Sequence, residues 1–238
     1  MARTESTGNL ITRAKEKADM ENSNFISDAE WYRSLNVWTA RLWNMLVKAD
    51  PDRYTVAQTL AADGSTVYDC PADYMGTVRV DYQTDSSQTI WVEIPRLYGT
   101  EENRLIQDQA DYPRGYMFRY NATTPSTQQI TILPPSSYAM RHLYIVAPPS
   151  YETDGTDSAE LVMGISGFEE YVVIGMAIDA RIKEESSVVQ LRQSQAEMSA
   201  HLEEMAENRS VADAGHVTDA RTHGYIDAAG IRWGRRDF

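Results

Sequence analysis

The chain has 238 residues, of which 42% are hydrophobic and 10% aromatic, so it can bury a sizeable core and does not have the composition of a disordered chain. Its single cysteine, Cys70, excludes an intramolecular disulfide framework and a site built from several cysteines, which suits a protein that matures in a reducing cytoplasm. A net charge of −13 repels phosphate backbones and therefore disfavours a conventional DNA-binding function.

The first predicted helix covers residues 8–20, where apolar side chains recur at helical spacing opposite Arg and Lys. The pattern then breaks at residues 22–24, which read Asn-Ser-Asn. Ser27 stands three residues before Glu30, which is the arrangement of a capping box. The sequence therefore predicts a second helix that begins at Asp28.

The second helix is expected to run to about Lys48 and carries a broad apolar face with three tryptophans, Trp31, Trp38 and Trp43. Trp38 and Trp43 differ in direction by about 140° around the helix, at about 100° per residue. They cannot both point into one narrow core. Either the chain's own fold wraps this helix on two sides, or Trp31 or Trp43 meets another subunit.

From about residue 54 to residue 149 the apolar period changes to two, which is typical of strands. The expected strands lie in 52–60, 76–82, 89–95, 115–121, 128–135 and 142–149. In the second of these, the alternation places Val78, Val80 and Tyr82 on one face, and Arg79 and Asp81 on the other. Short strands at this spacing predict a small antiparallel β-barrel or sandwich.

After a polar, acidic loop at 150–165, helical patterns return. Ser166 and Glu169 have the spacing of another capping box, and the following helix is expected to be almost fully buried around residues 171–178. A last helix, from about 187 to 208, has only a narrow apolar seam. Such a seam suits one partner helix or a neighbouring subunit.

We therefore predict an α+β fold in which two N-terminal and two C-terminal helices form an antiparallel bundle. The predicted divisions are a helical bundle domain from 1–50 and 166–214, an inserted β domain at 51–165, and an extended C-terminal arm at 215–238.

The predicted arm has no sustained period, yet it is rich in aromatic and arginine side chains. Two interpretations remain open: the segment folds back on its own bundle, or it docks on another chain, where such residues are favoured anchors. The predicted interface residues of the arm are Tyr225, Ile231, Arg232, Trp233, Arg235, Arg236 and Phe238.

The sequence offers no recognisable active site. The histidines, at 142, 201, 216 and 223, show no metal-ligand spacing, and no nucleophile elbow or phosphate-binding loop is present. Acidic groups at 101–102 and 108–111, and a possible cation loop at 154–160, are more typical of solvated turns. We expect no catalytic residue, no cofactor, no metal site and no enzyme activity.

Two segments resemble a known family. Residues 11–46, ITRAKEKADMENSNFISDAEWYRSLNVWTARLWNML, resemble the opening of the head-to-tail adaptor (connector) proteins of short-tailed phages. Residues 168–209 resemble the paired C-terminal helices of the same family, through FEEYVVIGMAI, the KEES break and a long charged helix ending in AENR. The predicted β domain and the arm match nothing in the family that can be quoted.

The resemblance implies a structural virion protein without enzyme activity. Its copies would form a ring, a dodecamer in this family, located in the virion neck after assembly in the host cytoplasm. The partners would be other copies of the chain, the portal protein, toward which the arm would reach, and a tail or nozzle protein.

The net charge is distributed unevenly along the chain: it is 0 for residues 1–50, −8 for 51–160, −6 for 161–214 and +1 for 215–238. An acidic solubilising surface explains this distribution most simply. In a ring, an acidic lumen would also let genomic DNA pass without specific binding.

Two other functions remain as alternatives. The chain could be a tail-completion or nozzle protein that docks through its β domain, or, from another class, a carbohydrate-binding or carbohydrate-processing β-domain protein. Because the N-terminus lacks an apolar segment and the longest apolar run is 171–178, we expect neither a membrane partner nor export by the usual route.

Overall fold

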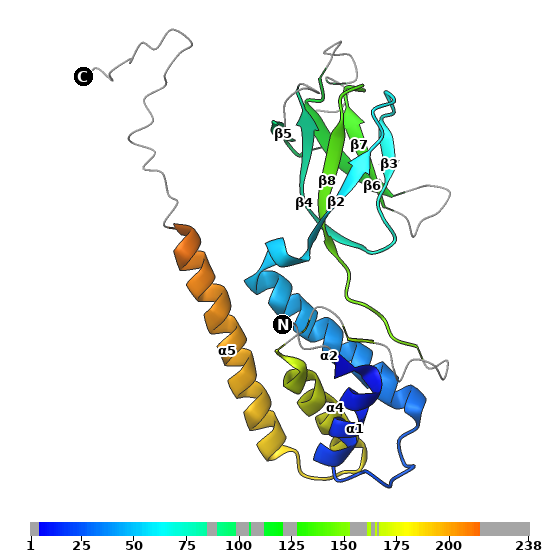
Figure 1. The fold of residues 1–238 in the computed structure, drawn as a ribbon, viewed down its shortest axis with the longest axis vertical. Helices are drawn as coiled ribbons and strands as arrows, with labels where there is room; N and C mark the ends of the chain where they lie inside the picture. The colour runs from blue at the N-terminus through cyan, green and yellow to red at the C-terminus, as the bar shows by residue number, and fades with distance from the viewer. Residues whose placement is uncertain are drawn as a thin grey trace, which may run out of the picture.

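The computed structural model describes residues 5–84, 90–98, 105, 112–120, 128–152, 161–162, 165 and 167–214. These residues form a mixed α+β structure, as predicted, with four α-helices and two larger antiparallel sheets. Figure 1 shows the helices gathered at one end of the molecule and the sheets at the other. We call α1, α2, α4 and α5 the helical body, and strands β2 to β8 the sheet module.

The helical body is made from both ends of the chain. Its helices are α1 (Thr7–Lys17), α2 (Asp28–Ala49), α4 (Glu169–Lys183) and α5 (Val189–Ala214). The capping box at Ser27 is confirmed, because the backbone N–H of Ser27 donates to Glu30 Oε2 at 2.9 Å and α2 begins at Asp28. The first helix ends before the predicted residue 20, since Asp19 takes a left-handed φ of 57°.

The second predicted capping box is not the start of α4. Phe168 precedes the helix in the capping position without a side-chain cap, and the backbone N–H of Gly167 donates to Glu169 Oε2 at 3.0 Å. Gly167 has a φ of +96°, which a side-chain-bearing residue rarely adopts, so the tight entry to the helix depends on this glycine. Ser166 lies outside the described residues.

Helix α4 is the centre of the helical body, in contact with α1, α2 and α5. Every residue from 171 to 178 is buried, as the sequence predicts. The close approach of α2 is possible because Gly175 has no side chain: a Cβ there would lie 2.1 Å from the Trp38 indole. Trp38 Nε1 also donates to Asp179 Oδ2 at 2.7 Å, which fixes the two helices in register.

The sheet module follows α2 through a short 3-10 turn, η1 (Pro51–Tyr54). Its strands are β2 (Thr55–Leu60), β3 (Val67–Asp69), β4 (Tyr74–Gln83), β5 (Trp91–Ile94), β6 (Gly115–Tyr120), β7 (Gln128–Leu133) and β8 (Met140–Val146). One sheet has the order β2-β8-β4-β5 and the other β3-β7-β6. Their facing sides share a core of Leu60, Cys70, Val80, Ile94, Tyr116, Ile130, Ile132 and Met140.

Of the two predicted alternatives, a barrel or a sandwich, a closed barrel is not seen among the described residues, which form two sheets with two edge strands each. An isolated bridge between Arg96 and Tyr116 links the two sheets at one side. The short strand β3 was not predicted from the sequence. Nor was the two-stranded pair of β1 (Glu5–Ser6) with β9 (Leu161–Val162), which ties the start of the helical body to the segment before α4.

The predicted faces of strand β4 need a correction. Val80 is buried and Asp81 lies on the opposite face, both as expected, but Val78 is 41% exposed. Irregular pairing with β8 near Thr77 and Arg79 shifts the alternation, so the two valines no longer lie on one buried face.

Candidate functional site

The interface residues predicted from the sequence divide into two groups. Those of the arm, namely Tyr225, Ile231, Arg232, Trp233, Arg235, Arg236 and Phe238, lie outside the described residues. Trp31 and Trp43, by contrast, are buried in their own chain, with 2% and 6% of their surface exposed. For these two side chains the expectation of a subunit contact is corrected: the fold itself wraps α2 on two sides.

Trp43 joins the helical body to the sheet module. Its Nε1 donates to the carbonyl oxygen of Val146 at 3.0 Å, and its ring lies 4.5 Å from that of Tyr54 between centroids. Val146 ends β8, and Tyr54 precedes β2. One indole therefore contacts both chain segments that connect the two regions.

A cluster of ion pairs joins α1 to the beginning of α4. The guanidinium of Arg13 binds both Glu5 and Glu170, and Lys17 Nζ binds the other oxygen of Glu170. Glu5 is only 8% exposed, so this carboxylate depends on its arginine for charge compensation. Glu170 is therefore shared by two cations, one from each end of this contact on α1.

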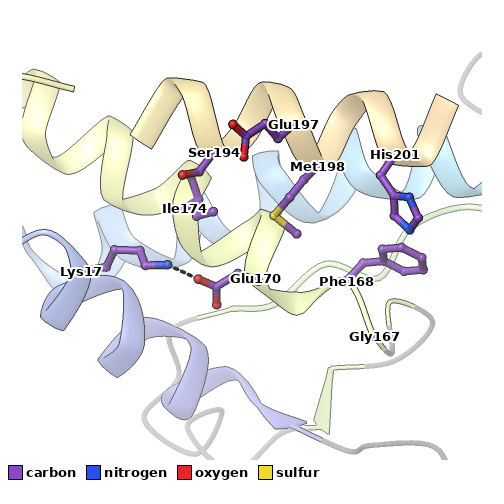
Figure 2. Close-up of a pocket in the computed structure, with 9 residues that line it drawn as sticks. All are labelled: Lys17, Gly167, Phe168, Glu170, Ile174, Ser194, Glu197, Met198 and His201. Carbon is purple, nitrogen blue, oxygen red and sulfur yellow. Dashed lines mark hydrogen bonds and ion pairs between the residues drawn. The ribbon is translucent and has the colours of Figure 1, made fainter. Parts of the chain in front are cut away.

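Beside this cluster lies a cavity of about 520 Å³ between α1, α4 and α5 (Figure 2). Its apolar wall is formed by Phe168, Ile174 and Met198, and its polar lining residues are Lys17, Glu170, Ser194, Glu197 and His201. In Figure 2, the Lys17–Glu170 pair lies toward one end, while the rings of Phe168 and His201 lie together at the other.

The lining of the cavity combines apolar side chains with a few polar groups. Figure 2 shows Met198 extending from α5 toward α4, so part of the wall comes from the narrow seam of the last helix. The seam was predicted from the sequence, but the cavity was not, because it depends on how three helices diverge.

Two titratable groups in the sheet module are buried rather than poised for reaction. Burial raises the pKa of the Cys70 thiol to about 11, so it stays protonated near neutral pH and is a poor nucleophile. Burial lowers the pKa of His142 to about 4, which keeps its imidazole neutral.

His142 belongs to a satisfied hydrogen-bond network. Its Nδ1 lies 3.2 Å from Gln58 Oε1, and its Nε2 lies 2.8 Å from Thr77 Oγ1. The neutral ring can donate to the amide oxygen and accept from the hydroxyl, whose own oxygen lies 3.0 Å from the Tyr74 hydroxyl. The network explains how a fully buried histidine is accommodated between two sheets.

The outer face of the four-stranded sheet carries a charged cluster, of which the sequence predicted only that Arg79 and Asp81 share a face. The nearly buried carboxylate of Asp81 accepts from Arg141 Nε at 2.9 Å, and Arg79 Nε lies 3.2 Å from the same oxygen. Arg141 in turn lies over the Trp91 ring at 4.2 Å. Strand alternation alone could place Asp81 and Arg141 on the outer face, but their pairing required the β4–β8 register.

Within the described ranges, no group of three or more His, Cys, Asp or Glu side chains is placed to hold a metal ion. The acidic segments at 101–102, 108–111 and 154–160, and the histidines at 216 and 223, lie outside these ranges. None of the helices that the structure describes combines the length and the apolar character needed to cross a membrane.

A comparison of the chain with known protein families and with curated proteins found no match.

Proposed function

We propose that the chain is the subunit of a phage head-to-tail adaptor, a ring that joins the portal to the tail and continues the DNA channel. The observation that carries this proposal is the packing of two distant segments. Residues 11–46 and 168–209, which resemble the two ends of the adaptor family, contribute the helices that pack together as one helical body (Figure 1).

Specific contacts between these two segments support the proposal. The Ser34 hydroxyl and Trp38 Nε1 both donate to Asp179 Oδ2, which joins the middle of α2 to α4. Lys183 Nζ lies 2.6 Å from Glu30 Oε1, so the capping box that begins α2 is also bound by the end of α4. The residues that give the resemblance are thus those that hold the helices together.

In the proposed subunit, the four helices form an antiparallel bundle, the sheet module is an insertion in it, and residues 215–238 form an arm. The arm carries the anchors for the portal, since Trp, Tyr and Arg dominate the energy of many protein interfaces. Trp31 and Trp43 have no part in this interface, because they are buried.

The charge of the chain fits a channel. Residues 51–160 carry a net charge of −8, and a lumen lined with carboxylates would repel the DNA backbone and let it slide. In this proposal the acidic side chains of the sheet module face the ring axis in the assembled particle.

Electron microscopy of the purified protein, alone and mixed with the portal ring of the same phage, tests the proposal. We expect closed rings stacked coaxially on the portal. A protein that remains monomeric, and that neither forms rings nor binds the portal at any concentration, would contradict an adaptor function.

The arm is tested separately with Arg232→Ala/Trp233→Ala/Arg235→Ala and, as a matched control in the same segment, His216→Ala/His223→Ala. Loss of interface anchors should weaken portal binding about thirtyfold or more, while the histidine variant should bind normally. Equal binding by both variants would remove the arm from the portal interface.

A further inference from the structure

The two sheets of the module have four edge strands, which differ in how well they are protected against pairing with another chain. Strand β3 has only three residues and includes Asp69. Strand β6 is met on its outer side by residues 95–97, through Tyr116 N–H to the Pro95 oxygen at 3.0 Å and Leu97 N–H to the Tyr116 oxygen at 2.7 Å. Short edges, charges and covering segments are the usual ways to block edge pairing.

Strand β2 has fewer of these protections, although β3 contacts it through Gln58 Nε2, which donates to the Asp69 carbonyl oxygen at 3.0 Å. It is six residues long, reads Thr-Val-Ala-Gln-Thr-Leu, and contains neither a charged residue nor a proline. It pairs with β8 on one side, and no described strand pairs with its other side. The opposite edge of the same sheet is β5 (Figure 1). It has four residues, includes Glu93, and continues into residues 95–97, which contact β6, so its open part is limited to β5 itself.

Both edges expose valine on the same face of the sheet. Val56 is 46% exposed and Val92 is 38% exposed. In the strand pairing, Val56 of β2 lies opposite Tyr144 of β8. Val92 of β5 lies opposite Tyr82 of β4, and Tyr82 lies opposite Met140 of β8. Residues opposite each other in antiparallel strands share a face, so both valines point to the inner side, where Tyr144 and Met140 are buried. They stay exposed because each lies where the sheet ends.

We propose that β2 of one copy of the chain pairs with β5 of the next copy, so that the four-stranded sheets join edge to edge around the ring. This inference rests on the adaptor function proposed above and names the interface between its subunits. The contact is heterologous, since one surface meets a different surface on the next copy, and such contacts generate rings when the rotation closes.

Strand direction agrees with this pairing. The sheet has four strands, and each neighbouring pair is antiparallel, so its two edges run in opposite directions. Placing identical sheets side by side in the same orientation therefore brings β2 and β5 together as antiparallel strands, and the joined sheet continues the same pattern.

The register follows from the exposed side chains. A register with Val56 opposite the next copy's Val92 buries both valines and brings Ile90, which is 54% exposed, onto the same face opposite Gln58. On the outer face it places Trp91 opposite Ala57, whose small side chain leaves room for an indole. A slip of one residue would instead bring Val56 opposite outward-facing positions, so the hydrophobic pattern specifies the register.

Engineered cysteines test the pairing directly in the full-length protein. Opposite residues in an antiparallel pair have Cα atoms about 4.5 to 5.5 Å apart, which suits a disulfide. We expect Val56→Cys/Val92→Cys to form a ladder of covalent multimers under mild oxidation. Cys70 gives little background, because its thiol is buried and has a raised pKa. Val67→Cys/Val92→Cys is the matched control, since Val67 is a similarly exposed valine on β3, and it should form no ladder.

Single-cysteine variants distinguish pairing of β2 with β5 of the next copy from pairing of β2 with a second β2. A mixture of Val56→Cys and Val92→Cys proteins should give a cross-linked dimer, whereas Val56→Cys alone should give none. Efficient cross-linking of Val56→Cys with itself would show β2 pairing with β2 about a two-fold axis and would overturn the proposal. Absence of a ladder from the double variant would also overturn it.

Variants with opposite charges at the two edges distinguish a failure of the proposed β2–β5 interface from a failure of the proposed adaptor function. Val56→Lys should reduce the assembly of rings seen by electron microscopy, and adding Val92→Glu should restore it by pairing opposite charges across the edge. If wild-type rings form on the portal but Val56→Lys rings form equally well, the sheet interface is wrong and the adaptor function stands. If the wild-type protein forms neither rings nor portal complexes, both proposals fail.

Discussion

The contacts that stabilise the helical body join residues much farther apart in the sequence than those that stabilise the sheet module. In the helical body, the interactions of Ser34 and Trp38 with Asp179 join residues that are 145 and 141 positions apart in the sequence. In the sheet module, all strand pairs lie between Thr55 and Val146. The sheet module therefore contains its own folding information, whereas the helical body requires both ends of the chain.

The two cores also differ in chemistry. The centre of the helical body is built from tryptophans and aliphatic residues, among them Trp31, Leu35, Leu42 and Met176. The sheet module buries a histidine with its hydrogen-bond partners. Hydrophobic packing depends little on pH, but a buried neutral base does, so the two regions should respond differently to acid.

Breaking the connection between the regions should have the largest effect. Trp43→Ala removes the ring contact with Tyr54 and the hydrogen bond to Val146, and should lower the free energy of unfolding by about 3–5 kcal/mol. In urea unfolding followed by circular dichroism, we expect the helical and sheet signals to separate into two transitions. Trp43→Phe keeps a ring but loses the N–H, so it should cost about 1 kcal/mol beyond the change in packing. An unchanged single transition for Trp43→Ala would show that the regions are not coupled through this residue.

Acid should destabilise the sheet module first. Burial lowers the pKa of His142 to about 4, while the unfolded chain takes up this proton near pH 6.5. The unfolded state therefore binds more protons between these values, and stability is lost as pH falls from about 6.5 to about 4, by up to about 3 kcal/mol. His142→Gln should flatten this pH dependence, although it lowers stability at every pH. An NMR titration that protonates His142 in the folded protein near pH 6.5 would contradict the prediction.

The capping box of the helical body should respond only at lower pH. The hydrogen bond from Lys183, followed by those from Ser27, lowers the pKa of Glu30 to about 2. A carboxylate with a depressed pKa stabilises the fold above its ordinary pKa, near 4.5, and this contribution is lost as pH falls from there toward 2. The helical signal should therefore persist in the range where the sheet signal declines.

A substitution at Gly175 tests the close packing of α2 on α4. Gly175→Ala would place a Cβ 2.1 Å from the Trp38 ring, and overpacking of this kind costs about 1–3 kcal/mol. In the Trp43→Ala background, where the two signals are expected to separate, the helical transition should move to lower urea while the sheet transition stays unchanged. Gly76→Ala is the matched control, because nothing lies within 4 Å of a Cβ there. Trp38→Leu in the Gly175→Ala background should recover part of the loss; a fully additive double-mutant cycle would argue against direct contact.

The smallest effect is expected at the start of α2. Ser27→Ala removes one member of the capping box and should lower the free energy of unfolding by about 1 kcal/mol. Ser27→Thr keeps the hydroxyl and should be close to the wild type. Equal losses for the two variants would assign the effect to packing rather than to the cap.

Local signals predicted the elements better than their contacts. The Ser27–Glu30 cap, the buried core of α4 and most strands follow from spacing alone, because these patterns lie within a few residues of each other. Strand β3 is too short to show a period, and the exposure of Val78 follows from an irregular pairing of β4 with β8. Local periodicity cannot reveal a shift that arises between two strands.

For the candidate sites, too, the local features were predicted and the contacts between elements were not. The sequence correctly identifies Trp38 and Trp43 as pointing in different directions, but not that Tyr54 and Val146 cover the second of them. The cavity beside Lys17 and the open edge of β2 arise from the arrangement of several elements, which no single window of sequence contains.

The central position of α4 has a consequence for synthesis on the ribosome. Chains emerge from the N-terminus, so α1 and α2 are made long before α4, which begins only at Glu169. During that interval the Trp38 indole has no α4 to pack against, while the whole sheet module can already form. The nascent chain should therefore present a folded sheet module beside two helices, α1 and α2, whose apolar faces are exposed. Chaperones that recognise exposed apolar surface should bind it until α4 has been translated.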